Sequence, residues 1–364
     1  MTCLHLSHSA DASDGGIAIS VAELLAAQQA AGLDARWLTA DRFAPLHRDR
    51  LLSRAVGDAN PSLLHLHGLW RSPTRIAPHL AACGQPLLIA THGMLDPGAM
   101  RISHRKKRLV WHLWERRALT AAHALHALCP EEAAAIRSLL PDAPIAVIPN
   151  GVALPPTGSR AEPLPPPPWI DQVSNDEQVL LFLGRFHSKK GLDPLLSAWQ
   201  TVAADAARQG WWLALVGYGD GGALQRRLEA APMSRVLTCG PVFGAEKQAA
   251  FAAASGFVLP SFSEGLPMAA LEAMAHRLPC LLSSFCNLPE AYSSGAALPA
   301  QPEPAALAAS LQHLFALSRA ERAEMGRSGR SLVAATYSWP QVAEQTRILY
   351  RWILGGGERP YFVR

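Results

Sequence analysis

The chain has 364 residues, of which 49% are hydrophobic and 17% charged, and this is enough apolar material for two domains with buried cores. Its net charge of +4 is too small to indicate a nucleic-acid partner, and no apolar run is long enough to span a bilayer. Because the first residues lack the basic start and apolar centre of a signal peptide, and the six cysteines include no C-x-x-C pair, we expect a cytoplasmic protein with reduced thiols.

The first part of the chain alternates apolar runs with helical patterns, which predicts a parallel α/β sheet. A strand at 2–6 leads through a polar loop to Gly15 and Gly16, and a helix is expected at 17–31. Ligands of such sheets bind beyond the carboxyl ends of the strands. His92 and Asp96 lie beyond such an end, although Asp96 can equally cap its own loop. Further strands are predicted at 63–66, 87–90, 125–128 and 145–148.

A basic helix is predicted at 101–120, in which Leu109, Val110, Leu113 and Trp114 form an apolar stripe. Two interpretations stay open. The helix lies on an anionic membrane surface, or it packs its stripe on the sheet and leaves the cations in water. Between 101 and 117 one residue, Glu115, is acidic, against the basic residues Arg101, Arg105, Lys106, Lys107, Arg108, Arg116 and Arg117.

Prolines crowd the middle of the chain, and such a run is extended and semi-rigid. We place an interdomain linker at 159–175, between a first domain at 1–158 and a second domain at 176–338. A last helix, predicted from 339, is assigned to the first domain through the resemblance given below. Strands of the second domain are predicted at 179–183, 212–216, 236–239, 256–259 and 279–282.

Two charged motifs of the second domain indicate a site for a ligand that contains phosphate. After the strand at 179–183, Arg185 and Lys190 can hold a phosphate as a bidentate fork and a point charge. In the stretch 259–275, Glu264 and Glu272 flank the start of a helix, whose N–H groups attract an anion. A nucleotide-sugar has this layout, with hydroxyls on both sides of a diphosphate. The alternative is a capped amphipathic helix with two solvated acids.

The segment 217–222 fits the pattern G-x-G-x-x-G after a strand. A dinucleotide-binding loop would also need an acid about 20 residues later, at the end of the next strand. That strand runs into Cys239 and Gly240 instead. We therefore favour a tight turn beneath a nucleotide and expect no cofactor.

Together these motifs resemble the GT4 family of retaining glycosyltransferases, which have the GT-B fold. The resemblance implies an α/β chain with two facing Rossmann-like domains, parallel sheets and a C-terminal helix that crosses back to the first domain. Where the family usually has a Gly-Gly pair, this chain departs from the pattern and reads Phe285 to Glu290. The matching motifs are Gly15-Gly16, His92, Pro149-Asn150-Gly151, Arg185 with Lys190-Gly191, and Glu264 to Glu272.

The resemblance also implies a function, namely transfer of a sugar from a UDP- or GDP-sugar to a hydroxyl of a glycan or lipid-linked acceptor, in cell-surface polysaccharide assembly. It assigns the acceptor side, near Gly15 and Asp96, to the first domain. No metal is expected, because the chain lacks a D-x-D motif. The implied catalytic residues are His92, Arg185, Lys190 and Glu264, and the implied donor-binding residues are Gly16, Arg185, Lys190, Ser263, Glu264, Gly265, Leu266 and Glu272.

Two other functions remain open. One is a nucleotide-sugar epimerase of the same fold, which would convert the donor without an acceptor. The other is a protein that binds a nucleotide-sugar without turning it over. The presence of Arg185, Glu264 and Glu272 disfavours the second alternative, because loss of these residues would be typical of it.

Overall fold

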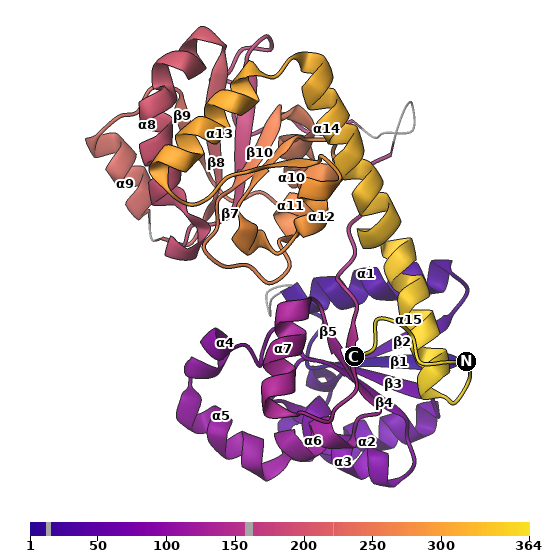
Figure 1. Ribbon diagram of the computed structural model, residues 1–364. Helices are drawn as coiled ribbons and strands as arrows, with labels where there is room; N and C mark the ends of the chain where they lie inside the picture. The colour runs from indigo at the N-terminus through magenta and orange to yellow at the C-terminus, as the bar shows by residue number, and fades with distance from the viewer. Residues whose placement is uncertain (12–15, 157–162, 221) are drawn as a thin grey trace. The chain divides into compact units, whose positions relative to one another are not determined.

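In the residues that the computed structural model describes (1–11, 16–156, 163–220 and 222–364), two six-stranded parallel sheets organise the chain (Figure 1). Each sheet belongs to a separate unit. Unit 1 is Met1–Gly151 together with Trp339–Arg364, and unit 2 is Val152–Ser338. The predicted α/β class is confirmed, as is the return of the C-terminal helix to the first domain.

The sheet of unit 1 has the strand order β2-β1-β3-β4-β5-β6. Its inner strands are buried on both faces because helices cover both sides, and the buried side chains are mainly apolar except for a group of histidines on one face. The order reverses beside β1, which leaves a topological switch point between β1 and β3. The strands are β1 (Thr2–Ser7), β2 (Asp34–Thr39), β3 (Leu63–His67), β4 (Leu87–Ala90), β5 (Ala124–Ala127) and β6 (Ile145–Val147).

Alternate residues of these strands enter two different cores. Leu4 and Leu64 pack with α2 (Arg48–Ala59), α3 (Ser72–Ala82) and α7 (Pro130–Leu139) on one face. Cys3 and Leu63 pack on the other face with α1 (Gly16–Ala30) and α15 (Trp339–Ile353). The last helix, α15, therefore helps to cover one face of the first sheet, although more than 180 residues separate it from β6. Single 3₁₀ turns lie at η2 (Ala40–Arg42) and η3 (Pro45–His47).

The sheet of unit 2 has the order β12-β11-β10-β7-β8-β9, with a switch point between β7 and β10. Its strands are β7 (Gln178–Arg185), β8 (Trp211–Tyr218), β9 (Val236–Cys239), β10 (Gly256–Leu259), β11 (Cys280–Leu282) and β12 (Ala297–Pro299). Its helical segments are η5 (Ser188–Lys190), α8 (Leu192–Arg208), α9 (Ala223–Ala230), α10 (Gly244–Ala253), α11 (Met268–Ala275), η6 (Ser284–Cys286), α12 (Pro289–Ser293), α13 (Pro304–Ala316), α14 (Arg319–Leu332) and the π-helical η7 (Val333–Tyr337).

The chain passes between the units at 151–152 and 338–339, and not through the predicted linker at 159–175. Residues 157–162 lie outside the described part. The rest of the predicted linker belongs to unit 2, because Trp169 and Val173 are buried in its core. At the true crossing, a Cβ on Gly151 would lie 2.3 Å from a ring carbon of Trp339, so only glycine fits there. This explains the glycine of the Pro149-Asn150-Gly151 motif.

The predicted basic helix at 101–120 is present as one continuous helical stretch at 104–121, which contains a π-helical turn, and a short separate helix precedes it. Ser103 has a φ of 56°, a left-handed conformation that stops the first segment. The segments are α4 (Pro97–Arg101), α5 (His104–Val110), the π-helical η4 (Trp111–Glu115) and α6 (Arg116–Ala121). No helix in the described residues is long and apolar enough to cross a bilayer.

Candidate active site

The loops that follow β7 and β10 meet at the switch point of unit 2. Lys190 follows β7, and its Nζ lies 2.6 Å from Oε1 of Glu264, which follows β10. The hydroxyl of Ser261 donates to the same oxygen at 2.5 Å. Both side chains of the ion pair are largely shielded from water, with exposed fractions of 25% for Lys190 and 10% for Glu264. The second oxygen of Glu264 has no partner among the described residues, so it can accept a hydrogen bond from a ligand.

Backbone contact holds the same two loops together. The N–H of Phe262 donates to the carbonyl oxygen of Lys189 at 2.7 Å. Gly191 has a φ of 69°, and a Cβ there would lie 2.0 Å from the carbonyl oxygen of Pro260. Glycine is therefore required after Lys190 for both conformation and space. The Lys-Gly motif of the sequence is explained by this close approach.

A third loop, after β11, is tied to Glu264 where the chain departs from the family pattern. Asn287 adopts a left-handed conformation with a φ of 55°, which asparagine tolerates better than most residues. Its Nδ2 donates to the carbonyl oxygen of Glu264 at 2.8 Å, and the N–H of Glu264 donates to the carbonyl of Phe285 at 3.0 Å. Asn287 thus positions the Glu264 loop by a side-chain bond that a glycine pair would lack.

The second carboxylate of the motif is also held by a lysine. Glu272 lies in α11, and Nζ of Lys247 in α10 approaches its Oε1 to 2.6 Å. Sequence analysis did not single out Lys247, because nothing in its spacing connects it with Glu272. The ion pair occupies Oε1 of Glu272, and a carboxylate has a second oxygen that can accept a hydrogen bond.

The loop between β10 and α11 presents backbone donors. Ser263 and Gly265 are exposed, whereas the side chain of Leu266 packs against the core of unit 2. The N–H groups of all three have no acceptor among the described residues. Such donors before a helix bind anions well, which supports the predicted position of a phosphate group.

Arg185, the last residue of β7, is exposed, and no carboxylate in the described part of the chain pairs with it. The turn after β8 approaches its side chain closely, since a Cβ on Gly219 would lie 2.8 Å from Cγ of Arg185. In the same turn, the carboxylate of Asp220 accepts from the N–H groups of Gly222 and Leu224 at 2.9 and 2.7 Å. Asp220 caps α9 in this way, as a tight turn requires. Gly221 lies outside the described residues.

In unit 1, His92 lies two residues after the end of β4 and has a strained backbone, with a φ of 50°. The buried carboxylate of Glu132, in α7, holds this turn on both sides. It accepts from the hydroxyl of Thr91, from the N–H of Gly93 at 2.5 Å and from the N–H of Leu128 at 2.7 Å. Sequence analysis missed Glu132, since an acid in the first turn of a helix ordinarily interacts with its own helix N-terminus.

The side chain of His92 is joined to further histidines. Its Nε2 lies 3.1 Å from Nδ1 of His67, and burial lowers the pKa of His92 to about 3. His92 is therefore a neutral imidazole at pH 7. His67 also lines a small pocket at the switch point between β1 and β3, together with Ser7, Gly68 and Met94.

Of the other residues predicted to lie at this edge of unit 1, the structure describes Gly16 and Asp96. Gly15 lies outside the described residues. Gly16 is the exposed first residue of α1, and a Cβ there would meet nothing within 4 Å, so packing does not demand glycine at this position. Asp96 precedes α4, and its carboxylate oxygen would lie 3.3 Å from a Cβ placed on Gly93.

Comparison with known proteins decides the family. Residues 177–316 match the family model described as "Glycosyl transferases group 1", and residues 40–151 match the "Glycosyl transferase 4-like domain". The chain belongs to the group 1 glycosyl transferases. The predicted family is therefore confirmed.

Individual relatives of this group 1 member agree with the assignment. A D-inositol 3-phosphate glycosyltransferase of Segniliparus rotundus is 31% identical over 196 residues, which are 50% of this chain and 41% of that protein. The sucrose-phosphate synthase of Thermosynechococcus elongatus superposes over 98% of this chain and 100% of its own, with a TM-score of 0.72 and 22% identity. Anabaena Alr3699/HepE, solved in complex with UDP, has a TM-score of 0.70 and 16% identity, with 96% of this chain and 99% of that chain covered. These structural likenesses confirm the GT-B fold.

Within unit 2 of the group 1 member, the structure brings Lys190 and Glu264 into direct contact and places Ser263, Gly265 and Leu266 in the same loop.

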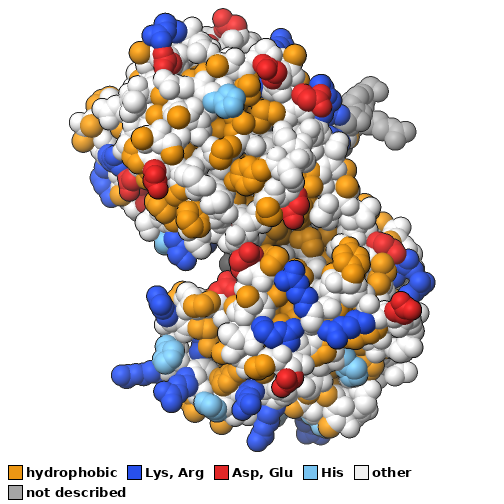
Figure 2. All heavy atoms as spheres, in the orientation of Figure 1, with side chains coloured by type: hydrophobic (Ala, Val, Ile, Leu, Met, Phe, Trp, Pro, Cys, Tyr) orange, Lys and Arg blue, Asp and Glu red, His pale blue; other side chains and the backbone are white. Residues whose placement is uncertain are grey.

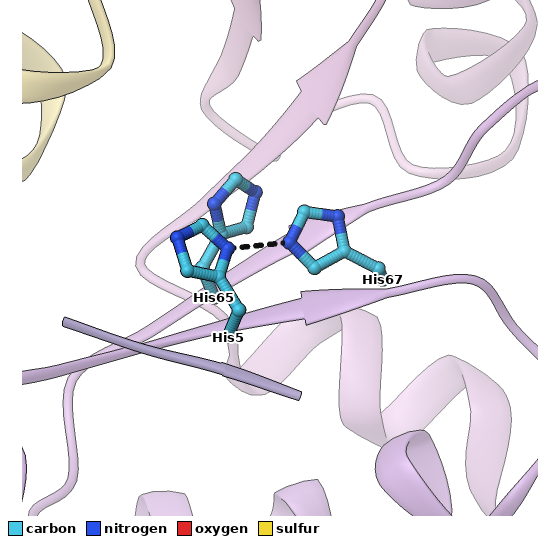
Figure 3. Close-up of side chains that lie close together, drawn as sticks. All are labelled: His5, His65 and His67. Carbon is cyan, nitrogen blue, oxygen red and sulfur yellow. Dashed lines mark hydrogen bonds between the residues drawn. The ribbon is translucent and has the colours of Figure 1, made fainter. Parts of the chain in front are cut away.

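One group of potential metal ligands is found in the described residues, and it lies in unit 1. It consists of His5, His65 and His67, each of which offers a ring nitrogen within 4.8 Å of the others (Figure 3). No sequence motif assigns a role to His5, His65 or His67.

Proposed function

We propose that this protein is a retaining glycosyltransferase that moves a sugar from a UDP- or GDP-sugar to a hydroxyl of a glycan or lipid-linked acceptor. Membership of the group 1 family supports the activity. The observation that carries the proposal is the shielded Lys190–Glu264 ion pair at the switch point of unit 2, where ligands of open α/β sheets bind.

In the proposed mechanism, departure of the nucleoside diphosphate is the step that builds up negative charge. Arg185 and Lys190 stabilise this charge, aided by the N–H groups of Gly265 and Leu266. One preorganised donor of this type is worth about 3–4 kcal/mol in the barrier. Glu264 orients Lys190 through one oxygen and accepts from a sugar hydroxyl through the other, while Glu272 binds the ribose.

The proposal extends to the other predicted ligand contacts. Gly16 approaches the donor, His92 accepts a hydrogen bond from the transferred sugar, and Gly15 and Asp96 lie on the acceptor side. Two cations and backbone donors supply the positive charge, so the reaction needs no Mg²⁺ or Mn²⁺. Cell-surface polysaccharide assembly is the proposed setting, in the cytoplasm.

A panel of nucleotide-sugars, scored by released UDP or GDP in the presence of glycan and lipid-linked acceptors, tests the activity. We expect release with one donor class that depends on an acceptor. Conversion of the donor without acceptor would indicate an epimerase instead. Binding by titration calorimetry without turnover of any donor would indicate a non-catalytic protein.

We further propose peripheral contact with an anionic membrane through 101–117. Leu109 and Leu113 of the predicted stripe are 60% and 55% exposed, and Ile102 is 69% exposed, so these side chains are not covered by the rest of the unit, whereas Val110 and Trp114 are half-buried. Figure 2 shows Lys and Arg side chains over α4 and α5 with hydrophobic side chains among them. Exposed apolar side chains among cations suit the surface of an anionic bilayer.

A further inference from the structure

Five histidines of unit 1 form a continuous hydrogen-bonded group. His5 lies on β1, His65 and His67 on β3, and His126 on β5, while His92 follows β4. The strand register pairs His5 with His65, and alternate residues of a strand share a face. His5, His65 and His67 therefore lie together on one face of the sheet (Figure 3). The sheet histidines are all less than 5% exposed.

The direction of the bonds at one end of the group is set by a backbone carbonyl, which only accepts. Nε2 of His126 lies 2.8 Å from the carbonyl oxygen of Ile148, so Nε2 carries the proton. Nδ1 of His126 then accepts from Nε2 of His65 at 3.3 Å. Nδ1 of His65 in turn accepts from the hydroxyl of Tyr350 at 2.8 Å.

A second carbonyl sets the direction independently. The hydroxyl of Thr346 donates to the carbonyl of Ala343 at 2.9 Å, so its oxygen accepts from Nε2 of Gln28 at 2.9 Å. This fixes the orientation of the Gln28 amide. The other N–H of that amide donates to the oxygen of Tyr350 at 2.9 Å, which leaves the proton of Tyr350 for its histidine partner. The carbonyls of Ile148 and Ala343 therefore require the same direction of the hydrogen bonds between Gln28, Tyr350 and His65.

From Gln28 the bonds continue to the surface of the unit. The amide oxygen accepts from Nε2 of His5 at 2.8 Å. Nδ1 of His5 accepts from Nε2 of His67 at 2.9 Å, and Nδ1 of His67 accepts from Nε2 of His92 at 3.1 Å. Nδ1 of His92 has no partner among the described residues. All five rings thus take the same tautomer, and no two donors or two lone pairs meet.

We propose that these bonds form a one-directional relay of five neutral histidines, protonated at Nε2, which fixes His92 as a hydrogen-bond acceptor at Nδ1. An acceptor at this atom pairs with a hydroxyl and not with a carbonyl or phosphoryl oxygen. That the hydroxyl belongs to a sugar rests on the proposed function. The clamp of Glu132 on Thr91 and Gly93 holds the backbone of His92, and the relay holds its ring.

Two further observations support neutral rings over a metal ion. Burial lowers the pKa of all five histidines, to about 4 for His5 and about 3 for His92. A metal bound by His5, His65 and His67 would need a lone pair from each ring directed at one point. Both ring nitrogens of each of the three already have a hydrogen-bond partner in the described structure.

The relay can be tested by ¹⁵N NMR of the full chain labelled at histidine, since the two neutral tautomers and the cation give different nitrogen shifts. We expect all five rings to be neutral and protonated at Nε2 from pH 6 to pH 8. Protonation of any of them at Nδ1, or an imidazolium in this range, would overturn the relay. So would a stoichiometric zinc content in the purified protein whose removal by a chelator changes these signals. None of these readouts requires turnover, so they stand apart from the test of the proposed function.

Two variants test the direction of the relay. In His67→Phe, His92 loses the acceptor of its Nε2 proton, so its nitrogen shifts should change. In the matched variant His126→Phe, the hydrogen bond from Gln28 to Thr346 still fixes the orientation of the Gln28 amide. The nitrogen shifts of His92 should therefore stay as in the unaltered protein. Unchanged His92 shifts in His67→Phe, or changed shifts in His126→Phe, would contradict the relay, with circular dichroism confirming that both variants are folded.

Discussion

At the scale of single residues, the candidate site is a set of charges whose partners differ. Lys190 is paired with Glu264, and Lys247 with Glu272, whereas Arg185 has no carboxylate partner in the described residues. A paired lysine is held in one place, and an unpaired arginine can give its whole fork to a phosphate. In the proposed donor site, the two cations would therefore hold one phosphate group in different ways.

We expect Arg185→Ala and Lys190→Ala each to lower kcat by about a hundredfold or more, because each removes charge stabilisation from the leaving diphosphate. Steady-state release of UDP or GDP measures the effect. Lys189→Ala is the matched control, since that side chain is exposed, adjacent and without an ion pair among the described residues. Turnover of both site variants close to that of the control would rule out the phosphate assignment.

Gly191→Ala should destabilise unit 2 because the added Cβ would meet the carbonyl oxygen of Pro260 in a left-handed backbone. Gly295→Ala is the control, since Gly295 has a similar φ of 71° but open space around its Cβ. Left-handed strain alone costs about 1–2 kcal/mol, so the difference between the two variants reports the steric contact. Chemical denaturation should show Gly191→Ala as the less stable by at least about 2 kcal/mol. Equal stabilities of the two variants would mean that the loop at Gly191 moves away from Pro260 at little cost in free energy.

At the scale of elements, the predicted basic helix at 101–120 differs from the observed one in its start and in its middle. Ser103 turns the chain before the helix begins, and η4 widens the continuous helical stretch 104–121 at Trp111–Glu115. Glu115 is buried there, and its carboxylate accepts from the N–H of Trp70 and the hydroxyl of Thr74 at 3.0 Å each. Burial raises its pKa to about 7. The one acid of the basic segment therefore faces inward, and the outer surface is left to cations and apolar side chains.

This surface leads us to expect salt-sensitive binding to vesicles that contain phosphatidylglycerol, and none to vesicles of phosphatidylcholine alone. Each basic residue near an anionic surface contributes about 1 kcal/mol, and the exposed apolar side chains add to it. Co-sedimentation at low and high salt measures binding. The double variant Leu109→Ser with Leu113→Ser should bind more weakly, and Leu46→Ser, which changes an even more exposed leucine outside the segment, should not. Equal, negligible sedimentation under all conditions would remove the membrane proposal.

At the scale of the whole molecule, the two units carry different chemistry. Unit 2 holds the cations and carboxylates of the candidate donor site, while unit 1 holds the buried histidines. The predicted facing arrangement of the two domains stays a prediction.

Activity should persist in EDTA, because Arg185, Lys190 and backbone N–H groups supply the positive charge that a metal supplies elsewhere. Initial rates with and without chelator, and with added Mn²⁺, test this expectation. Loss of activity on chelation that Mn²⁺ restores would show that the diphosphate site has been misread.

Acidification should loosen unit 1 before unit 2. Since burial lowers the pKa of His5, His65, His67, His92 and His126, the unfolded chain binds protons below about pH 6.5 that the folded unit does not. The contribution of these histidines to stability is therefore complete above this pH and falls below it, by up to about 1.4 kcal/mol per histidine and pH unit, until the folded-state pKa is reached. In the described part of unit 2, one histidine, His276, has a lowered pKa.

Hydrogen exchange of β1 and β3 amides, compared with β7 and β8 amides at pH 7 and pH 5, measures this difference. After correction for the intrinsic rates, protection in unit 1 should fall more. An equal change in both units would contradict the buried-neutral state of the histidines.

The sequence by itself determined much of the fold, because burial on both faces of a parallel sheet leaves continuous apolar runs that local reading detects. Of the twelve strands in the described residues, ten were predicted, and the two missed were β2 (Asp34–Thr39) and β12 (Ala297–Pro299), which lie at edges of the sheets. β2 alternates the exposed Asp34 and Arg36 with more buried residues and β12 is three residues long, so neither forms a continuous apolar run. The order of motifs likewise identified the family before any coordinates.

Tertiary structure alone decided which side chains meet. Lys247 reaches Glu272, Asn287 reaches Glu264, and Tyr350 reaches His65 across 285 residues, and no periodicity records such contacts. The boundary between the units also needed the structure, because burial of Trp169 and Val173 overrides the extended preference of a proline-rich segment. Local patterns follow from the chemistry of neighbouring residues, whereas a site depends on chain segments brought together by packing, and only the folded chain shows these.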